Sequence, residues 1–154
     1  MQKRTLFSLI AVFSICLPAY TQMFPRDNDR VLSGVTAFDA IFSVPVWLNV
    51  QQDIDRFRRN GQSTFELMLR RDGVRVDPAA PNYLICEISP AQSGNIVFYH
   101  YAVEYWEYVI GGVHVLLWDA GGVVTIGARQ FNHEEVVSDC VDAFANVWLK
   151  HNPR

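Results

Sequence analysis

The stretch IVFYHYAVEYWEYVIGG, Ile96 to Gly112, decides how this chain folds. Aromatic and β-branched residues of this density are typical of a strand, and two consecutive glycines are typical of a hairpin turn. The segment VHVLLW, residues 113–118, then predicts the returning strand. If Gly111 and Gly112 form a two-residue turn, Tyr105 lies opposite Trp118 across the hairpin. The sequence therefore predicts an antiparallel hairpin with a strongly aromatic surface.

The same register divides the side chains of the hairpin between two faces of the sheet. One face, with Trp106, Tyr108 and Leu117, is nearly all apolar, so we expect it to pack against helices. The other face combines aromatic rings with polar groups, so we expect it to be open to solvent. This predicted open face consists of Tyr99, Tyr101, Tyr105, Glu107, His114 and Trp118.

Two interpretations of the predicted open face remain. Aromatic cross-strand pairs stabilise a sheet by roughly 0.2–1 kcal/mol each, so the rings can be purely structural. Tyrosine and tryptophan also offer large, rigid contact area, so the face can instead bind a protein partner or support dimerisation. Both interpretations predict that these side chains are exposed.

Helical periodicity predicts two amphipathic helices. The first follows the cap residue Asp53 and stops at Gly73, with a break near Asn60–Gly61 and a restart at Ser63 as the alternative. The second follows the cap residue Asn132 and ends before Pro153. Alternating or apolar runs predict further strands over residues 44–50, 82–89 and 123–128.

These elements predict an α+β fold with the order β-α-β-β-β-β-α. Two amphipathic helices need one apolar surface to cover, and a mixed sheet of four or five strands with both helices packed on one face provides it. If the first two strands are neighbours in the sheet, the helix between them makes them parallel. The remaining strands form an antiparallel meander, with turns at residues 90–94 and 119–122.

The start of the chain has the features of a secretory signal peptide. A short basic segment precedes the apolar run Leu6–Leu17, and the residues Ala19-Tyr20-Thr21 predict cleavage after residue 21. Cys16 follows an isoleucine rather than a small residue, which argues against lipid attachment. We therefore expect a signal peptide at 1–21, a flexible arm at 22–33 and a single domain at 34–154, located in a bacterial periplasm or outside the cell.

Export would determine which cysteines remain in the mature chain and whether they are oxidised. Removal of residues 1–21 leaves only Cys86 and Cys140, and each lies on an apolar face, one on a strand and one on the last helix. An oxidising compartment favours a disulfide between thiols that meet, so the sequence predicts a Cys86–Cys140 bridge. The alternative is two buried free thiols that pack as small hydrophobic groups.

No catalytic, cofactor-binding or metal-binding residue is predicted. The formal net charge of −3 gives no electrostatic support for nucleic-acid binding. The chain lacks a G-x-S-x-G motif and a phosphate-binding glycine loop, and its histidines and acids lack a metal-ligand spacing. Glu104 and Glu107 differ by three positions in a strand, so they point to opposite faces and cannot share a site unless a bulge intervenes.

Three segments together resemble small exported bacterial proteins of uncharacterised function with a TolB N-terminal-like layout. They are LMLRRDGVRV at 67–76, LLWDAGG at 116–122 and VDAFANVWLKHNP at 141–153. The resemblance implies an envelope location and a binding or assembly role, and it implies no catalytic residue. We therefore expect an exported non-enzymatic binding or envelope-assembly protein with a protein partner or self-association and no membrane span after signal removal. The alternatives are a homodimeric structural protein and a small hydrolase with an unrecognised site.

Overall fold

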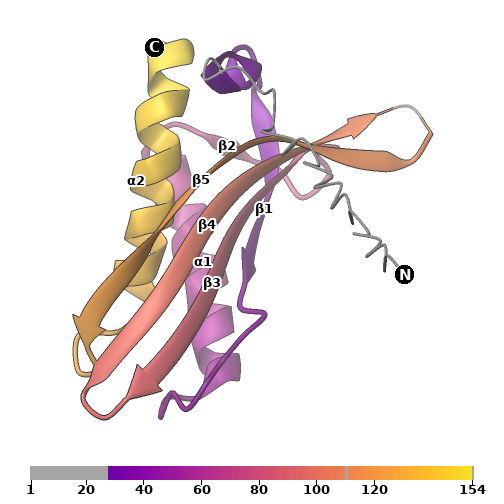
Figure 1. Ribbon diagram of the computed structural model, residues 1–154. Coiled ribbons are helices and arrows are strands. Elements are labelled where there is room, and N and C mark those ends of the chain that lie inside the picture. Colours follow the sequence, from indigo (N-terminus) through magenta and orange to yellow (C-terminus); the bar gives the residue numbers. More distant parts are fainter. Residues whose placement is uncertain (1–27, 110, 154) are drawn as a thin grey trace, which may run out of the picture.

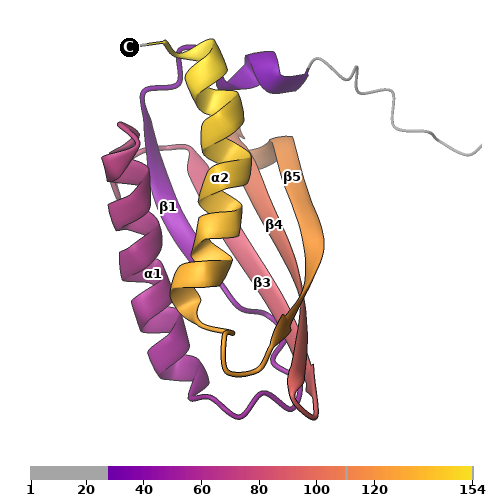
Figure 2. The ribbon, with the colours of Figure 1, turned by 90° about the vertical axis from the view of Figure 1, so that its left-hand side faces the viewer.

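The computed structural model describes residues 28–109 and 111–153. Its elements are η1 (Asn28–Leu32), β1 (Ala37–Ser43), α1 (Ile54–Arg71), β2 (Arg75–Val76), β3 (Tyr83–Ser93), β4 (Ile96–Val109), β5 (Val113–Gly127) and α2 (His133–His151). The strands form one five-stranded sheet in the order β2-β1-β3-β4-β5 (Figure 1). Strand β1 is parallel to β2 and β3, and β3, β4 and β5 form an antiparallel meander. Helices α1 and α2 lie side by side on one face of the sheet (Figure 2), which confirms the predicted α+β fold.

Both predicted helix caps are confirmed. The side chain of Asp53 accepts a hydrogen bond from the Arg56 amide at 2.8 Å, and that of Asn132 accepts one from the Glu135 amide at 3.0 Å. Helix α1 runs without a break through Gly61, so the alternative with a restart at Ser63 is wrong. Gly61 is there because α1 passes close to the sheet, where a Cβ at this position would overlap the ring of Phe42.

The strand predicted at 44–50 is wrong. Strand β1 lies earlier in the chain and ends at Ser43, and within residues 44–50 only Leu48 forms an isolated bridge, with Ala91. Pro45 lacks an amide hydrogen for a ladder, and Asn49 adopts a positive φ of 56°, so the segment cannot continue as a regular strand. It forms an irregular connection to α1.

The turn predicted at 119–122 is also wrong, because β5 continues through it as far as Gly127. Gly121 and Gly122 serve close packing instead. A Cβ at Gly121 would overlap the carbonyl oxygen of Tyr101, and Gly122 lies against the Tyr101 ring. The turn predicted at 90–94 falls later too, since β3 extends to Ser93.

The hairpin has a different register near its turn from the predicted one. Val109 pairs with Val113, so the loop contains three residues, 110–112, rather than two. The ladder shifts between Tyr105 and Trp106, where Leu117 is the extra residue on β5. The shift compensates for the longer loop, and Tyr105 pairs with Trp118 as predicted.

A disulfide joins Cys86 of β3 to Cys140 of α2, as the sequence predicts. The two Cα atoms are 5.9 Å apart and both side chains are fully buried. The bridge fastens the last helix to the middle of the sheet.

The N-terminal part of the domain begins earlier than predicted. The predicted signal peptide, residues 1–21, lies outside the described residues. Of the predicted flexible arm, residues 28–32 form a 3-10 helix, Leu32 is fully buried, and its carbonyl oxygen accepts a hydrogen bond from Asn152 Nδ2 at 2.8 Å. No helix in the described ranges is long and apolar enough to cross a lipid bilayer.

Candidate functional site

The predicted open face is wrong for its main aromatic residues. Tyr99 and Tyr105 are 1% exposed and Trp118 is 3% exposed, all beneath the helices. The Tyr105 ring contacts Phe38 edge-on at 5.6 Å, and the Trp118 ring contacts Phe144 at 6.0 Å. These rings are part of the hydrophobic core.

The polar tips of the buried rings find partners at the rim of the core. The Tyr99 hydroxyl donates to Asp139 of α2 at 2.5 Å, and the Trp118 indole donates to Asp29 of η1 at 3.2 Å. Burial and the neighbouring Asp139 carboxylate raise the pKa of Tyr99, and burial together with Glu107 raises the pKa of Tyr105 to about 12. Both phenols therefore stay protonated at neutral pH, as core hydrogen-bond donors.

The remaining members of the predicted open face do not lie together. Tyr101 is half-buried on the helix side over Gly122, and Glu107 lies near the Tyr105 hydroxyl at 3.5 Å. His114 lies on the opposite side of the sheet, against the rings of Tyr83 at 4.5 Å and Tyr108 at 5.5 Å. The six predicted residues are thus divided between two faces.

The face that no described helix covers carries the alternate set of side chains. We call it the open sheet face. Its larger side chains, read from the strand register and the alternation of burial, include Asp39, Tyr83, Glu87, Phe98, His100, Glu104, Trp106, Tyr108, His114, Asp119 and Val123. Phe98 is 45%, Tyr108 47% and Val123 74% exposed. The face therefore exposes large apolar and aromatic side chains to solvent.

The open sheet face is also acidic. It carries four carboxylates, and strands β1, β3, β4 and β5 contain no lysine or arginine. Glu104 lies directly opposite Asp119, an arrangement of like charges that destabilises a sheet. Glu104 also accepts a hydrogen bond from the Trp106 indole at 2.8 Å. A sheet selected only for stability would avoid the Glu104–Asp119 pair.

The end of the β4–β5 hairpin projects beyond both helices (Figure 1). Side chains on both of its faces are exposed there. Tyr108 on the open sheet face is 47% exposed, and on the other face Val109 is 37%, Val113 56% and Val115 38% exposed. An uncovered two-stranded apolar hairpin gains little stability from its own packing. We call residues 107–109 and 111–115 the hairpin arm. Tyr108 and His114 join it to the open sheet face, whereas its exposed valines lie on the opposite face.

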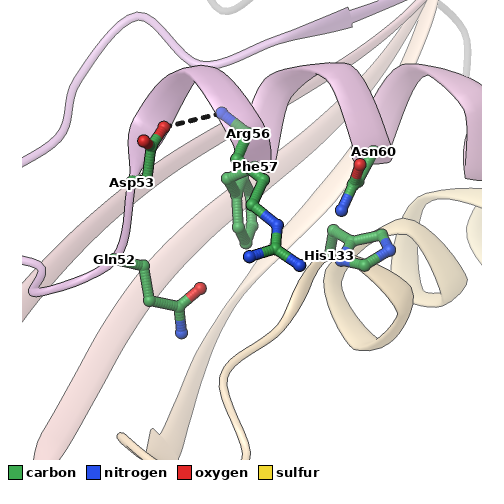
Figure 3. A pocket seen from close by; sticks show the side chains of 6 residues that line it. All are labelled: Gln52, Asp53, Arg56, Phe57, Asn60 and His133. Atoms are coloured by element: carbon green, nitrogen blue, oxygen red, sulfur yellow. Dashed lines mark hydrogen bonds between the residues drawn. The ribbon is translucent and has the colours of Figure 1, made fainter.

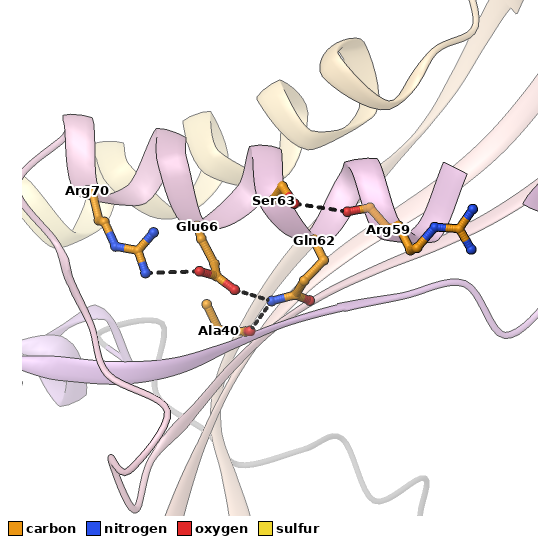
Figure 4. Close-up of polar contacts among 6 residues, drawn as sticks. All are labelled: Ala40, Arg59, Gln62, Ser63, Glu66 and Arg70. Atoms are coloured by element: carbon orange, nitrogen blue, oxygen red, sulfur yellow. Dashed lines mark hydrogen bonds and ion pairs between the residues drawn. The ribbon is translucent and has the colours of Figure 1, made fainter. Parts of the chain in front are cut away.

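The opposite edge of the sheet is closed by α1 (Figure 4). Gln62 bonds the backbone of β1 as a neighbouring strand would: its amide nitrogen donates to the Ala40 carbonyl and its oxygen accepts from the Phe42 amide, both at 2.7 Å. Glu66 in turn accepts from Gln62 at 2.8 Å and from Arg70 at 2.9 Å. Strand β5 forms the other edge of the sheet.

A separate polar hollow lies where the first turns of α1 and α2 meet (Figure 3). It encloses about 380 Å³ and is lined by Gln52, Asp53, Arg56, Phe57, Asn60 and His133. The sequence predictions did not include these residues as a site. Arg56 and His133 are 77 positions apart, so their proximity cannot be read from the sequence. The only local pattern that could have indicated a site is the spacing of Arg56 and Asn60, at i and i+4, which places both on the side of α1 that carries Phe57. No group of three or more His, Cys, Asp or Glu side chains that could hold a metal ion occurs in the described part of the chain.

Comparisons with known proteins assign no family. No protein-family model and no curated protein matches the chain. Among solved structures, the PelC dodecamer of Paraburkholderia phytofirmans is 17% identical, with 72% of this chain and 88% of that chain covered and a TM-score of 0.46. An uncharacterised protein is 10% identical, with 74% and 87% covered and a TM-score of 0.36. The likeness to TolB-type domains stays a prediction.

Proposed function

We propose that the chain is an exported, non-enzymatic assembly protein that binds a second copy of itself through the open sheet face. The observation that carries this proposal is the uncovered face itself, which combines exposed aromatic residues with four carboxylates and no lysine or arginine from the four long strands. Exposed apolar patches of this kind mark interaction surfaces. The Glu104–Asp119 pair favours a cationic partner, because a bound cation removes the repulsion between the two carboxylates.

The same molecule carries a complementary surface. Helix α1 contains five arginines, at positions 56, 58, 59, 70 and 71, and it packs on the other face of the sheet. Guanidinium groups pair with carboxylates and stack on tryptophan and tyrosine rings. We therefore favour a head-to-tail contact between the open sheet face of one copy and α1 of the next, because a two-fold contact between two open sheet faces would bring carboxylates together.

Two features support export. The signal peptide predicted at 1–21 would direct secretion, and the Cys86–Cys140 disulfide is the kind of bond that persists in an oxidising compartment. A bacterial periplasm or the extracellular space is the location we propose.

Sedimentation velocity of residues 22–154 over a range of protein concentrations tests the proposed association. Phe98→Glu places a further negative charge on the open sheet face and should give a monomer. The matched control is Leu149→Glu, at a residue 38% exposed on α2, which should associate as the wild type does. A wild-type chain that stays monomeric at every concentration, or equal effects of the two substitutions, would contradict the proposal.

A further inference from the structure

We infer that the hollow between the first turns of α1 and α2 binds a small ligand through an oxyanion group, a carboxylate or a phosphate. This inference does not rest on the proposed assembly, although Arg56 also belongs to the α1 surface proposed to contact the open sheet face of a second copy. Figure 3 shows the Arg56 guanidinium between Gln52 and His133, with the Asn60 amide on the His133 side. Four nitrogen-bearing side chains thus line one hollow.

Within the described residues, the side chains of Arg56, Asn60 and His133 form no hydrogen bond or ion pair. Arg58 and Arg70 on the same helix pair with Asp55 at 4.0 Å and Glu66 at 2.9 Å. The Arg56 guanidinium and the Asn60 amide form no ion pair or hydrogen bond in residues 28–109 and 111–153. The His133 ring contacts Phe57 edge-on at 6.3 Å. An arginine that enters a hollow without a counter-ion is the group that an oxyanion would bind, in a two-bond geometry.

The backbone ends of the helices are not the recognition element. Asp53 and Asn132 already occupy the Arg56 and Glu135 amides as caps. The anion would therefore be held by side chains, and the helix dipoles would add only a weak favourable field.

The floor and wall of the hollow suit a ligand with a flat apolar part. Phe57 is 4% exposed and stacks on Phe131, with ring centres 5.2 Å apart and planes at 12°. The Gln52 amide nitrogen donates to the Phe131 carbonyl at 2.6 Å, which leaves the Gln52 oxygen as an acceptor toward the hollow. A ring or hydrocarbon group against Phe57 and a donor near Gln52 would complement the anion at Arg56.

One negative charge near the hollow would repel an anionic ligand. The Asp53 carboxylate lies on the lining of the hollow. Asparagine caps a helix as well as aspartate does, so Asp53→Asn removes the charge and keeps the cap. A bound anion should therefore bind more tightly to Asp53→Asn, whereas a cation would bind more weakly.

NMR titrations of residues 22–154 with sodium benzoate, sodium acetate and inorganic phosphate test this inference. We expect saturable shifts of the His133 ring and the Arg56 side-chain N–H, with benzoate bound more tightly than acetate. Arg56→Gln should weaken binding by about tenfold or more, because it removes charged hydrogen bonds. The matched control is Arg59→Gln, on the same helix and outside the hollow (Figure 4), which should bind as the wild type does.

Three results would overturn the inference: shifts that grow linearly without saturation, equal weakening by Arg56→Gln and Arg59→Gln, or weaker binding to Asp53→Asn. Equal affinity for benzoate and acetate would overturn the role given to Phe57. Saturable binding of phosphate without saturable binding of benzoate would identify a site for inorganic anions and would contradict the inference that the ligand has an apolar organic part. Each variant should give an unfolding curve like that of the wild type, which excludes misfolding as the cause of weaker binding.

Discussion

Gly61 is the residue whose missing side chain lets α1 lie close to the sheet. In an exposed helix, replacing glycine by alanine stabilises by about 1 kcal/mol. Here the new Cβ would overlap the ring of Phe42, which is buried and packed against Phe57 at 6.0 Å. We therefore predict that Gly61→Ala lowers the free energy of unfolding by about 1–3 kcal/mol, measured by urea denaturation.

A second substitution separates crowding from helix propensity. In a Phe42→Leu background the ring is gone, so Gly61→Ala should become neutral or stabilising. Destabilisation of the same size in both backgrounds would show that the contact with Phe42 is not the cause.

Tyr105 gives a prediction for alkaline pH. The phenol has a pKa of about 12 in the folded chain against an ordinary value of 10.0, so the folded state holds its proton more tightly than the unfolded state does. The free energy of unfolding should therefore fall as the pH rises from about 10 to about 12. Tyr105→Phe cannot titrate and should lose less stability over this interval, measured by urea midpoints at several pH values. An identical pH dependence in the two proteins would rule out this contribution.

At the scale of elements, the disulfide fixes α2 to β3. The two cysteines are 54 positions apart, and a loop of this length is worth about 4 kcal/mol in the chain-entropy model. We predict that the double substitution Cys86→Ala, Cys140→Ala lowers the free energy of unfolding by about this amount. Reduced wild-type protein is the control, since it loses the bridge and keeps both side chains. A large loss in the alanine variant but none on reduction would assign the effect to lost packing.

At the scale of the whole molecule, charge is unevenly distributed. Carboxylates and aromatic rings lie on the open sheet face, and five arginines lie on α1. If this polarity drives head-to-tail association, raising the salt from about 0.1 M to about 1 M should weaken it, because the Debye length falls from about 10 Å to about 3 Å. Sedimentation at the two salt concentrations measures the effect. Stronger association in high salt would point instead to apolar contacts of the hairpin arm.

Local rules were sufficient for several features. The caps at Asp53 and Asn132, the α+β order of elements and the Cys86–Cys140 pairing followed from neighbouring residues, periodicity and the apolar faces of two elements. These features depend on short-range hydrogen bonds or on the burial of an apolar stripe, which the sequence specifies directly.

The tertiary structure alone decided which face of the hairpin is buried and where the polar hollow lies. Strand alternation predicts two sets of side chains, but the choice between them depended on partners far along the chain: Asp139 for Tyr99 and Asp29 for Trp118, at separations of 40 and 89 residues. Those partners let large rings with polar tips enter the core. The hollow likewise exists only because packing brings the first turns of two distant helices together.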